Sequence, residues 1–255
     1  MYSDGAPCAY FQEGRCVSHL TKHSWAVHEA AMLVAGRLLG APRVLGRGCL
    51  ERALRVAAVY HDLGKAAVSF QGEGRSFRLH EHVGALILWV AADEASKRGH
   101  TGLARVLMVA AGAVARHHAA MPGRHPVEVA ESTGDIKAIA GLAREVPPGT
   151  PGLLAGGSIP VLLEGALARI RRGLSYQEAR GIVERVKDMR HYESDLLTDT
   201  IMVAGALIVA DILVSSVERN TQVTKSYARS WMRELGISMG TLQQITRHPS
   251  KPTLD

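Results

Sequence analysis

The spacing of apolar residues is the feature that most limits how this chain can fold. Between residues 18 and 40, residues such as Val27, Ala30 and Val34 recur at steps of three and four, as in a helix with one buried face. Similar spacing predicts helices over residues 49–60, 79–97, 101–117, 135–144, 161–172, 175–189, 195–217 and 227–235. No convincing run alternates polar and apolar residues, so a sheet has little support. We therefore expect an all-α fold, a single globular bundle over residues 1–255, with residues 1–17 as an irregular lead-in and 247–255 as a flexible tail.

Composition and cysteine count narrow the class of protein. Apolar residues make up 47% of the 255 positions and charged residues 21%, a balance typical of a folded globular protein rather than a disordered one. Three cysteines, Cys8, Cys16 and Cys49, are an odd number in a chain with no secretory signal, so we expect no disulfide framework and a cytoplasmic location. Cys8 and Cys16 with His19 and His23 loosely imitate a zinc-binding set, but the cysteines are too far apart for the usual knuckle.

The most apolar stretch contains a charge that needs an explanation. Residues 201–217 fall short of the roughly 20 residues that a membrane span needs, and they include Asp211. A buried helix fits this stretch better, so we expect no membrane segment. An ionised carboxylate on a buried helix is costly unless a cation or strong hydrogen-bond donors compensate it. Asp211 is therefore expected to have such a partner.

The placement of the histidines indicates a metal site. Most of the twelve histidines lie at the ends of predicted helices or beside acidic residues. Imidazoles and carboxylates together form a ligand set for first-row divalent metals, and helix bundles often assemble such sites from facing side chains. The sequence offers enough candidates for two ions: His23, His61, Asp62, His80, His117, His118 and Asp211. Asp62, at the centre of this set, is the natural bridging ligand, and Gly64 is expected to end its helix in a left-handed conformation.

These residues carry a resemblance at two levels. The His61-Asp62 doublet with outlying His23 and Asp211 resembles the pattern of HD-superfamily phosphohydrolases, which are all-helical. A more specific resemblance, to the HD nuclease of type I CRISPR systems, rests on an ordered series of motifs: His61-Asp62-Leu63-Gly64-Lys65, Phe70-Gln71, His80-Glu81, His117-His118, and Ala210-Asp211 with Ser215. One departure is Gly84, which stands where a serine is usual; we expect it to alter packing more than chemistry.

The resemblance implies a role for each candidate residue. One ion would be held by His23, His61, Asp62 and Asp211, and the other by Asp62, His80, His117 and His118. His23 fits the family's first helix better than His19 or His28, which remain alternatives for the first ligand. Asp62 and Lys65 would be the catalytic residues, with Lys65 reaching a phosphate oxygen. The ions would be two divalent metals, such as Mn, Mg, Ni, Co or Fe.

The expected substrate and partners follow from the same resemblance. Single-stranded DNA is the implied substrate, and a net charge of +6 suits a polyanion without establishing that one binds. Four arginines near the ligand segments could guide its phosphates: Arg75, Arg78, Arg116 and Arg124. Because the chain shows no phosphate-binding glycine-lysine loop, we expect a stand-alone nuclease that works with a separate helicase and an RNA-guided surveillance complex.

Other functions remain open at this stage. An HD-type nucleotide phosphohydrolase or phosphodiesterase would share the doublet, but it need not share Phe70-Gln71 or the His117-His118 pair. A non-catalytic, metal-stabilised subunit of a surveillance complex is a further alternative, although no candidate ligand is missing. Glu81 is expected to orient a ligand histidine or to form a plain salt bridge. The sequence does not determine the metal, the choice between internal and terminal cutting, a DNA or RNA preference, or the oligomeric state.

Overall fold

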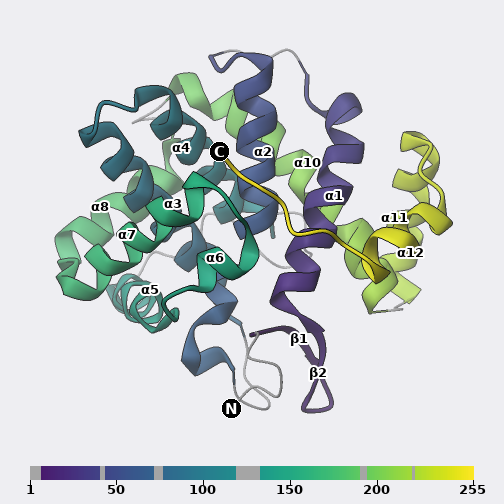
Figure 1. Ribbon diagram of the computed structural model, residues 1–255, viewed down its shortest axis with the longest axis horizontal. Helices are drawn as coiled ribbons and strands as arrows, with labels where there is room; N and C mark the ends of the chain where they lie inside the picture. The colour runs from purple at the N-terminus through teal and green to yellow at the C-terminus, as the bar shows by residue number, and fades with distance from the viewer. Residues whose placement is uncertain (1–6, 41–43, 72–76, 119–132, 190–193, 220–221) are drawn as a thin grey trace.

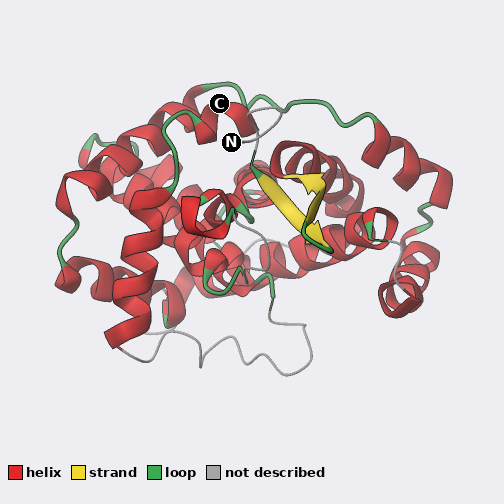
Figure 2. Cartoon of the chain, turned by 90° about the horizontal axis from the view of Figure 1, so that it is seen from below, coloured by secondary structure: helices red, strands yellow, loops and turns green. Residues whose placement is uncertain are grey.

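The molecule is a bundle of helices in which a few central helices are surrounded by the others (Figure 1). The computed structural model describes residues 7–40, 44–71, 77–118, 133–189, 194–219 and 222–255. Its helices are α1 (Leu20–Leu38), α2 (Arg47–Tyr60), α3 (His80–Lys97), α4 (Thr101–Arg116), α5 (Thr133–Glu145), α6 (Thr150–Leu154), α7 (Ser158–Gly173), α8 (Tyr176–Lys187), α10 (Ser194–Glu218), α11 (Gln222–Leu235) and α12 (Met239–Arg247), with 3-10 turns η1 (Leu63–Ala66) and η2 (Val68–Phe70). The all-α prediction is confirmed, since the described residues form only one sheet, a two-stranded one (Figure 2).

Helices α2 and α10 pack against each other, and each also packs against α1 and α4; these four helices form the centre of the bundle. Many of the buried residues on these helices are small, among them Ala57 and Ala58 on α2 and Ala110 and Ala111 on α4, all fully buried. Alanines allow helix backbones to approach closely, so side chains at the helix ends can meet across short distances. Helix α3 packs along α4 and is also covered by α5, α7 and α8, which explains why its sequence is apolar nearly all round.

Helix α10 contains the apolar stretch that sequence reasoning assigned to the interior. By length and composition it could cross a membrane, but most of it is buried inside the fold. It packs against α1, α2, α4, α11 and α12, and these neighbours cover most of its surface, which explains why its sequence is apolar on nearly every side. The prediction of a buried helix is confirmed: α10 is a core helix of this fold.

The prediction of an irregular lead-in over residues 1–17 is wrong for residues 8–17, and the helix expected from Ser18 begins at Leu20. Strands β1 (Cys8–Gln12) and β2 (Arg15–His19) pair as an antiparallel hairpin, and Glu13 and Gly14 form its turn with φ of 50° and 78°. Two left-handed residues suit the right-handed twist of a hairpin. Each strand has only five residues and the register is interrupted, so the sequence shows no clear alternation.

The expectation of no disulfide is also wrong. Cys8 and Cys16 are joined, because the hairpin brings their Cα atoms to 5.8 Å, within the usual range for a disulfide. The loose zinc set therefore loses both of its sulfur ligands to this bond. Cys49 is a free, exposed cysteine.

The end of the chain is a docked segment and not the flexible tail that the sequence predicted. The Gly156 amide donates to the Pro252 carbonyl at 2.9 Å, the Leu254 amide donates to the Gly156 carbonyl at 2.8 Å, and the Leu254 side chain is buried. In Figure 1 this segment runs from α12 across α1. A run of so few residues carries no helical period, and the five-residue α6 and nine-residue α12 escaped prediction for the same reason.

The predicted helices are present, with ends that differ by a few residues. The capping box at the start of α8 is confirmed: the Ser175 hydroxyl accepts from the Glu178 amide at 3.2 Å, and the Glu178 carboxylate accepts from the Ser175 amide at 3.0 Å. The largest shifts are at α7, which begins at Ser158, and at α11, which begins at Gln222.

Candidate metal centre

The ends of three helices meet at the proposed site. His61 follows the last residue of α2, His80 is the first residue of α3, and His117 and His118 follow α4. His23 lies in the first turn of α1, and Asp211 lies within α10. The structure therefore brings the predicted ligands together from five helices, around Asp62.

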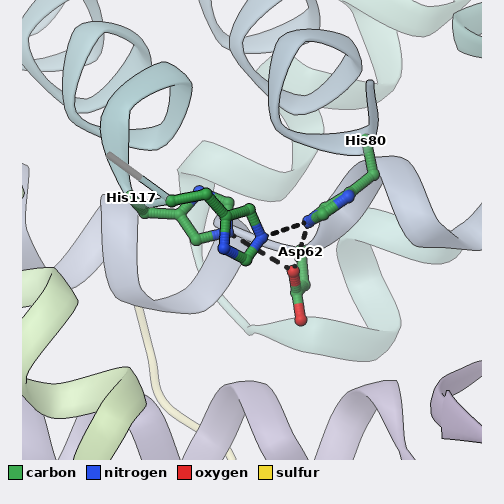
Figure 3. A group of neighbouring side chains, drawn as sticks. Asp62, His80 and His117 are labelled. Carbon is green, nitrogen blue, oxygen red and sulfur yellow. Dashed lines mark hydrogen bonds and ion pairs between the residues drawn. The ribbon is translucent and has the colours of Figure 1, made fainter. Parts of the chain in front are cut away.

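The seven side chains fall into two groups that share one carboxylate. In the first group, ligand atoms of His23, His61 and Asp62 lie within 4.8 Å of one another; in the second group the same holds for Asp62, His80, His117 and His118. Figure 3 shows Asp62, His80 and His117 pointing toward one another. Asp211 joins the first group, since its Oδ1 lies 3.3 Å from His23 Nε2.

The two oxygens of Asp62 face different groups. Oδ1 lies 3.1 Å from His80 Nε2 and 3.7 Å from His117 Nε2, whereas Oδ2 lies 3.5 Å from His23 Nε2 and 3.4 Å from His61 Nε2. The carboxylate is almost fully buried, with 2% of its side chain exposed. This is the arrangement that a carboxylate bridging two ions requires.

Three of the imidazoles are oriented by the same kind of local hydrogen bond. The Nδ1 atoms of His61, His80 and His117 lie 2.9, 2.5 and 2.6 Å from the carbonyl oxygens of the residues three positions earlier, Ala58, Phe77 and Val114. A carbonyl can only accept, so each of these contacts assigns a proton to Nδ1 and leaves Nε2 facing the cluster. The local chain at three helix ends thus presents Nε2 donors to a common point.

The donor set fits divalent metal ions. Within the part of the chain that the structure describes, Asp62 Oδ1 and His117 Nε2 are buried and make no hydrogen bond, which is costly for polar atoms without an ion. Donor spacings such as 3.0 Å between His80 Nε2 and His118 Nε2, and 3.7 Å between His117 Nε2 and Asp62 Oδ1, match those of ligands that each lie about 2.0–2.2 Å from one ion. Nitrogen and oxygen donors of this kind suit Mn, Fe, Co, Ni and Zn alike.

Charge in the first group is balanced by protons when no metal is bound. Burial opposes protonation of His23, but Glu218 and Asp211 outweigh it and raise its pKa to about 10. Burial likewise disfavours the Asp62 and Asp211 carboxylates, yet Lys65 and His61 beside Asp62, and His23 beside Asp211, hold both pKa values well below the usual range. A metal ion in this group would therefore replace the Nε2 proton of His23.

The second group has a different proton balance. Burial lowers the pKa values of His80 and His118, so these rings are neutral and suited to bind metal without losing a proton. Burial also acts on His117, but the Asp62 carboxylate outweighs it and raises the pKa.

Lys65 lies on η1 beside the bridging carboxylate. Its Nζ donates to Asp62 Oδ2 at 2.6 Å and sits 5.3 Å from the centre of the Phe77 ring. The ammonium group thus provides positive charge at the oxygen that faces the first group. Contact between Lys65 and a substrate phosphate stays a prediction.

Gly64 is required here for a different reason from the one the sequence indicated. It is not among the described glycines with positive φ, so the predicted left-handed helix end is wrong. A Cβ at this position would lie 2.8 Å from the carbonyl carbon of His80 and nearer still to its oxygen. Only glycine lets the loop after the doublet pass this close to the start of α3.

Some residues that support the site gave a partial sequence signal or none. Gln71, part of the Phe70-Gln71 motif, donates through its amide to the carbonyls of Lys65 and Cys8 at 2.5 and 3.1 Å, and so ties the hairpin to the metal-site loop. Glu81 lies 3.2 Å from His80 Nδ1, consistent with the predicted orienting role or salt bridge. Glu218, which lies 2.8 Å from His23 Nδ1, was not singled out from the sequence, because only folding brings it to a residue 195 positions away.

Of the predicted arginines, the two that the structure describes are engaged in contacts of their own, and the alternative histidines belong to neither ligand group. Arg116 donates to the carbonyls of Gly112, Val186 and Lys187 at 2.9 Å each, so it ties α8 to the end of α4 instead of presenting a free guanidinium. Arg78 is exposed and pairs with Asp135 at 3.1 Å. Arg75 and Arg124 lie outside the described residues. His19 and His28 are in neither ligand group of the described chain, and burial lowers the pKa of His28 to about 4.

The comparison with protein families agrees with this geometry. Residues 20–148 match the family described as HD domain, so the chain belongs to the HD domain family. It is accordingly a metal-dependent phosphohydrolase in its general class. No curated protein and no solved structure matched the chain in these comparisons. Asp211 lies beyond the matched residues, and it is the packing of α10 on α1 that brings it to the site.

Proposed function

We propose that this protein hydrolyses phosphodiester bonds of single-stranded DNA with two divalent metal ions. The observation that carries the proposal is the pair of ligand groups sharing Asp62, with one carboxylate oxygen facing each group. Two ions bound there would lower the pKa of a shared water and neutralise charge on the phosphate and the leaving oxygen.

The chain's own residues prepare the site for this reaction. Asp62 keeps the two groups in register, and the backbone carbonyls at Ala58, Phe77 and Val114 hold three imidazoles with Nε2 inward. The Lys65 ammonium group donates to Asp62 Oδ2 at 2.6 Å in the protein without metal, and with ions bound to the carboxylate it would be available to stabilise charge on a phosphate oxygen.

The burial of the ligand side chains limits which substrates can reach them. The side chains of His61 and Asp62 are 0% and 2% exposed, so a rigid duplex cannot bring a phosphate to them as easily as a flexible strand or a small molecule can. That burial equally suits a nucleotide, which keeps an HD-type nucleotide phosphohydrolase as the second candidate. The Phe70-Gln71 and His117-His118 motifs favour the nuclease, because their resemblance is to CRISPR-associated HD nucleases.

The proposed setting follows from the same resemblance. The protein would act in the cytoplasm in CRISPR interference, on a strand that a separate helicase and an RNA-guided surveillance complex make accessible. Its charge of +6 suits a nucleic-acid substrate.

A substrate screen tests the proposal. Purified protein is incubated with each divalent metal in turn against single-stranded DNA, duplex DNA, RNA and mononucleotides. We expect metal-dependent cleavage of the single strand, reduced to background by Asp62→Asn and unchanged by Glu184→Gln, whose carboxylate pairs with Arg180 on the surface of α8. Turnover of mononucleotides alone would favour the second candidate, and cleavage of DNA by Asp62→Asn would refute the two-metal arrangement.

A further inference from the structure

A carboxylate that is not in either ligand group contacts the site from behind. Glu218 is the last residue of α10 and lies two helical turns after Asp211, on the same side of the helix. Its Oε2 lies 2.8 Å from Nδ1 of His23, the nitrogen opposite the one that faces the cluster. Helix α10 therefore supplies two carboxylates to one imidazole, one at each nitrogen.

The position of Glu218 is fixed by a second contact. The hydroxyl of Ser18, on strand β2, donates to Glu218 Oε1 at 3.1 Å, and the Ser18 side chain is buried. Each oxygen of the carboxylate thus has its own partner. The contacts join the hairpin, α1 and α10 at the rear of the first ligand group.

His23 differs in this respect from most of the other ligand imidazoles. His61 and His117 place Nδ1 against neutral backbone carbonyls, and His80 places it against a carbonyl at 2.5 Å with Glu81 at 3.2 Å, whereas the Nδ1 contact of His23 is to the Glu218 carboxylate at 2.8 Å. A carboxylate holds the Nδ1 proton more strongly than a carbonyl does and makes the opposite nitrogen a better donor to a cation. It also adds negative charge near the place where a cation would bind.

We propose that Glu218 is a positioning residue that sets the affinity of one ion of the pair, the ion held by His23, His61, Asp62 and Asp211. The other ion, held by Asp62, His80, His117 and His118, does not depend on it. This inference rests on the two-ion centre proposed above. If Glu218 were only a structural link between α10 and α1, its loss would instead lower the affinity for both ions together, or for neither.

Metal binding distinguishes these possibilities without any activity measurement. Mn²⁺ is titrated into metal-free protein, and the number and affinity of bound ions are measured by calorimetry and metal analysis. We expect two ions in the wild type, and in Glu218→Ala a loss of about 10- to 100-fold in affinity for one of them. Glu218→Gln keeps an oxygen that can accept from Nδ1 and should lose less affinity than Glu218→Ala. Glu184→Gln is the matched control and should bind both ions as the wild type does.

Double variants identify the affected ion. Glu218→Ala combined with His23→Ala should bind Mn²⁺ as tightly as His23→Ala alone. Glu218→Ala combined with His118→Ala should bind both ions with lower affinity. The imidazole ¹⁵N signals of His23 give an independent readout, because loss of the carboxylate should shift the Nδ1 resonance in metal-free protein. If Glu218→Ala unfolds, Ser18→Ala with Glu218→Gln provides the same test in a milder form.

The outcomes separate the inference from the proposed function. A wild type that binds no ions would overturn both. A wild type that binds two ions, together with folded Glu218 variants that bind both as tightly or lose both equally, would overturn only the role of Glu218.

Discussion

Substitution of Gly64 by alanine tests whether the close backbone approach beside the doublet is needed for the metal centre. A Cβ there would lie 2.8 Å from the carbonyl carbon and 2.9 Å from the Cα of His80. Ordinary carbon contacts begin near 3.5 Å, so the loop and the start of α3 must separate by roughly 1 Å. Because both sides of the contact are backbone, no side-chain rotation can relieve it.

The displacement has two measurable consequences. Overpacking a buried contact costs about 2 kcal/mol, which for a domain of this size lowers Tm by roughly 4–8 °C. His80 also moves away from Asp62, whose Oδ1 now lies 3.1 Å from its Nε2. Misplacement by about 1 Å in a catalytic site can lower the rate of reaction by about 100-fold.

The assay combines thermal unfolding, Mn²⁺ titration and cleavage of single-stranded DNA. Gly36→Ala is the control, because this exposed glycine on α1 has nothing within 4 Å of the added Cβ, and the change should stabilise the helix by about 0.5–1 kcal/mol. We expect Gly64→Ala to weaken Mn²⁺ binding in the group that contains His80. If Gly64→Ala keeps wild-type stability and Mn²⁺ affinity, the argument from close approach is refuted.

Two further predictions concern stability. In metal-free protein His23 has a folded pKa of about 10 against 6.5 when unfolded, so its contribution is complete below pH 6.5 and is lost as pH rises toward 10. Urea unfolding in the presence of a chelator should show this decline in the free energy of unfolding. His23→Gln should remove most of the decline, and saturating Mn²⁺ should abolish it. A decline that persists unchanged in His23→Gln would contradict its attribution to His23. Cys16→Ser, which opens a disulfide between residues eight apart, should lower the free energy of unfolding by about 2–3 kcal/mol in urea titrations. A dithiol reductant should destabilise the wild type but not the variant, and equal sensitivity of both would contradict this account.

The helices and the ligand types could be predicted because both depend on neighbours in the chain. Apolar spacing along α1, α2 and α4 depends on one buried face per helix, and that face is visible in any window of a dozen residues. The position of His61, His80 and His117 at helix ends is equally local, as is the carbonyl three residues earlier that orients each ring.

The hairpin, the disulfide and the docked C-terminal segment could not be predicted in this way. Their residues are too few to show a period, and their stability comes from contacts with distant parts of the chain. Leu254, for example, pairs with Gly156, and Gln71 reaches back to Cys8. Loop-closing contacts of this kind depend on where the helices have already placed their ends.

The sequence by itself determined that this chain forms amphipathic and buried helices and that it contains enough imidazoles and carboxylates for a metal centre. Only the tertiary structure decided that each oxygen of Asp62 faces a separate group, that Gly64 passes against His80, and that Glu218 stands behind His23. The reason is physical: periodicity reports which face of a helix is buried, whereas the partner of a buried charge is chosen by packing between elements that can lie nearly two hundred residues apart.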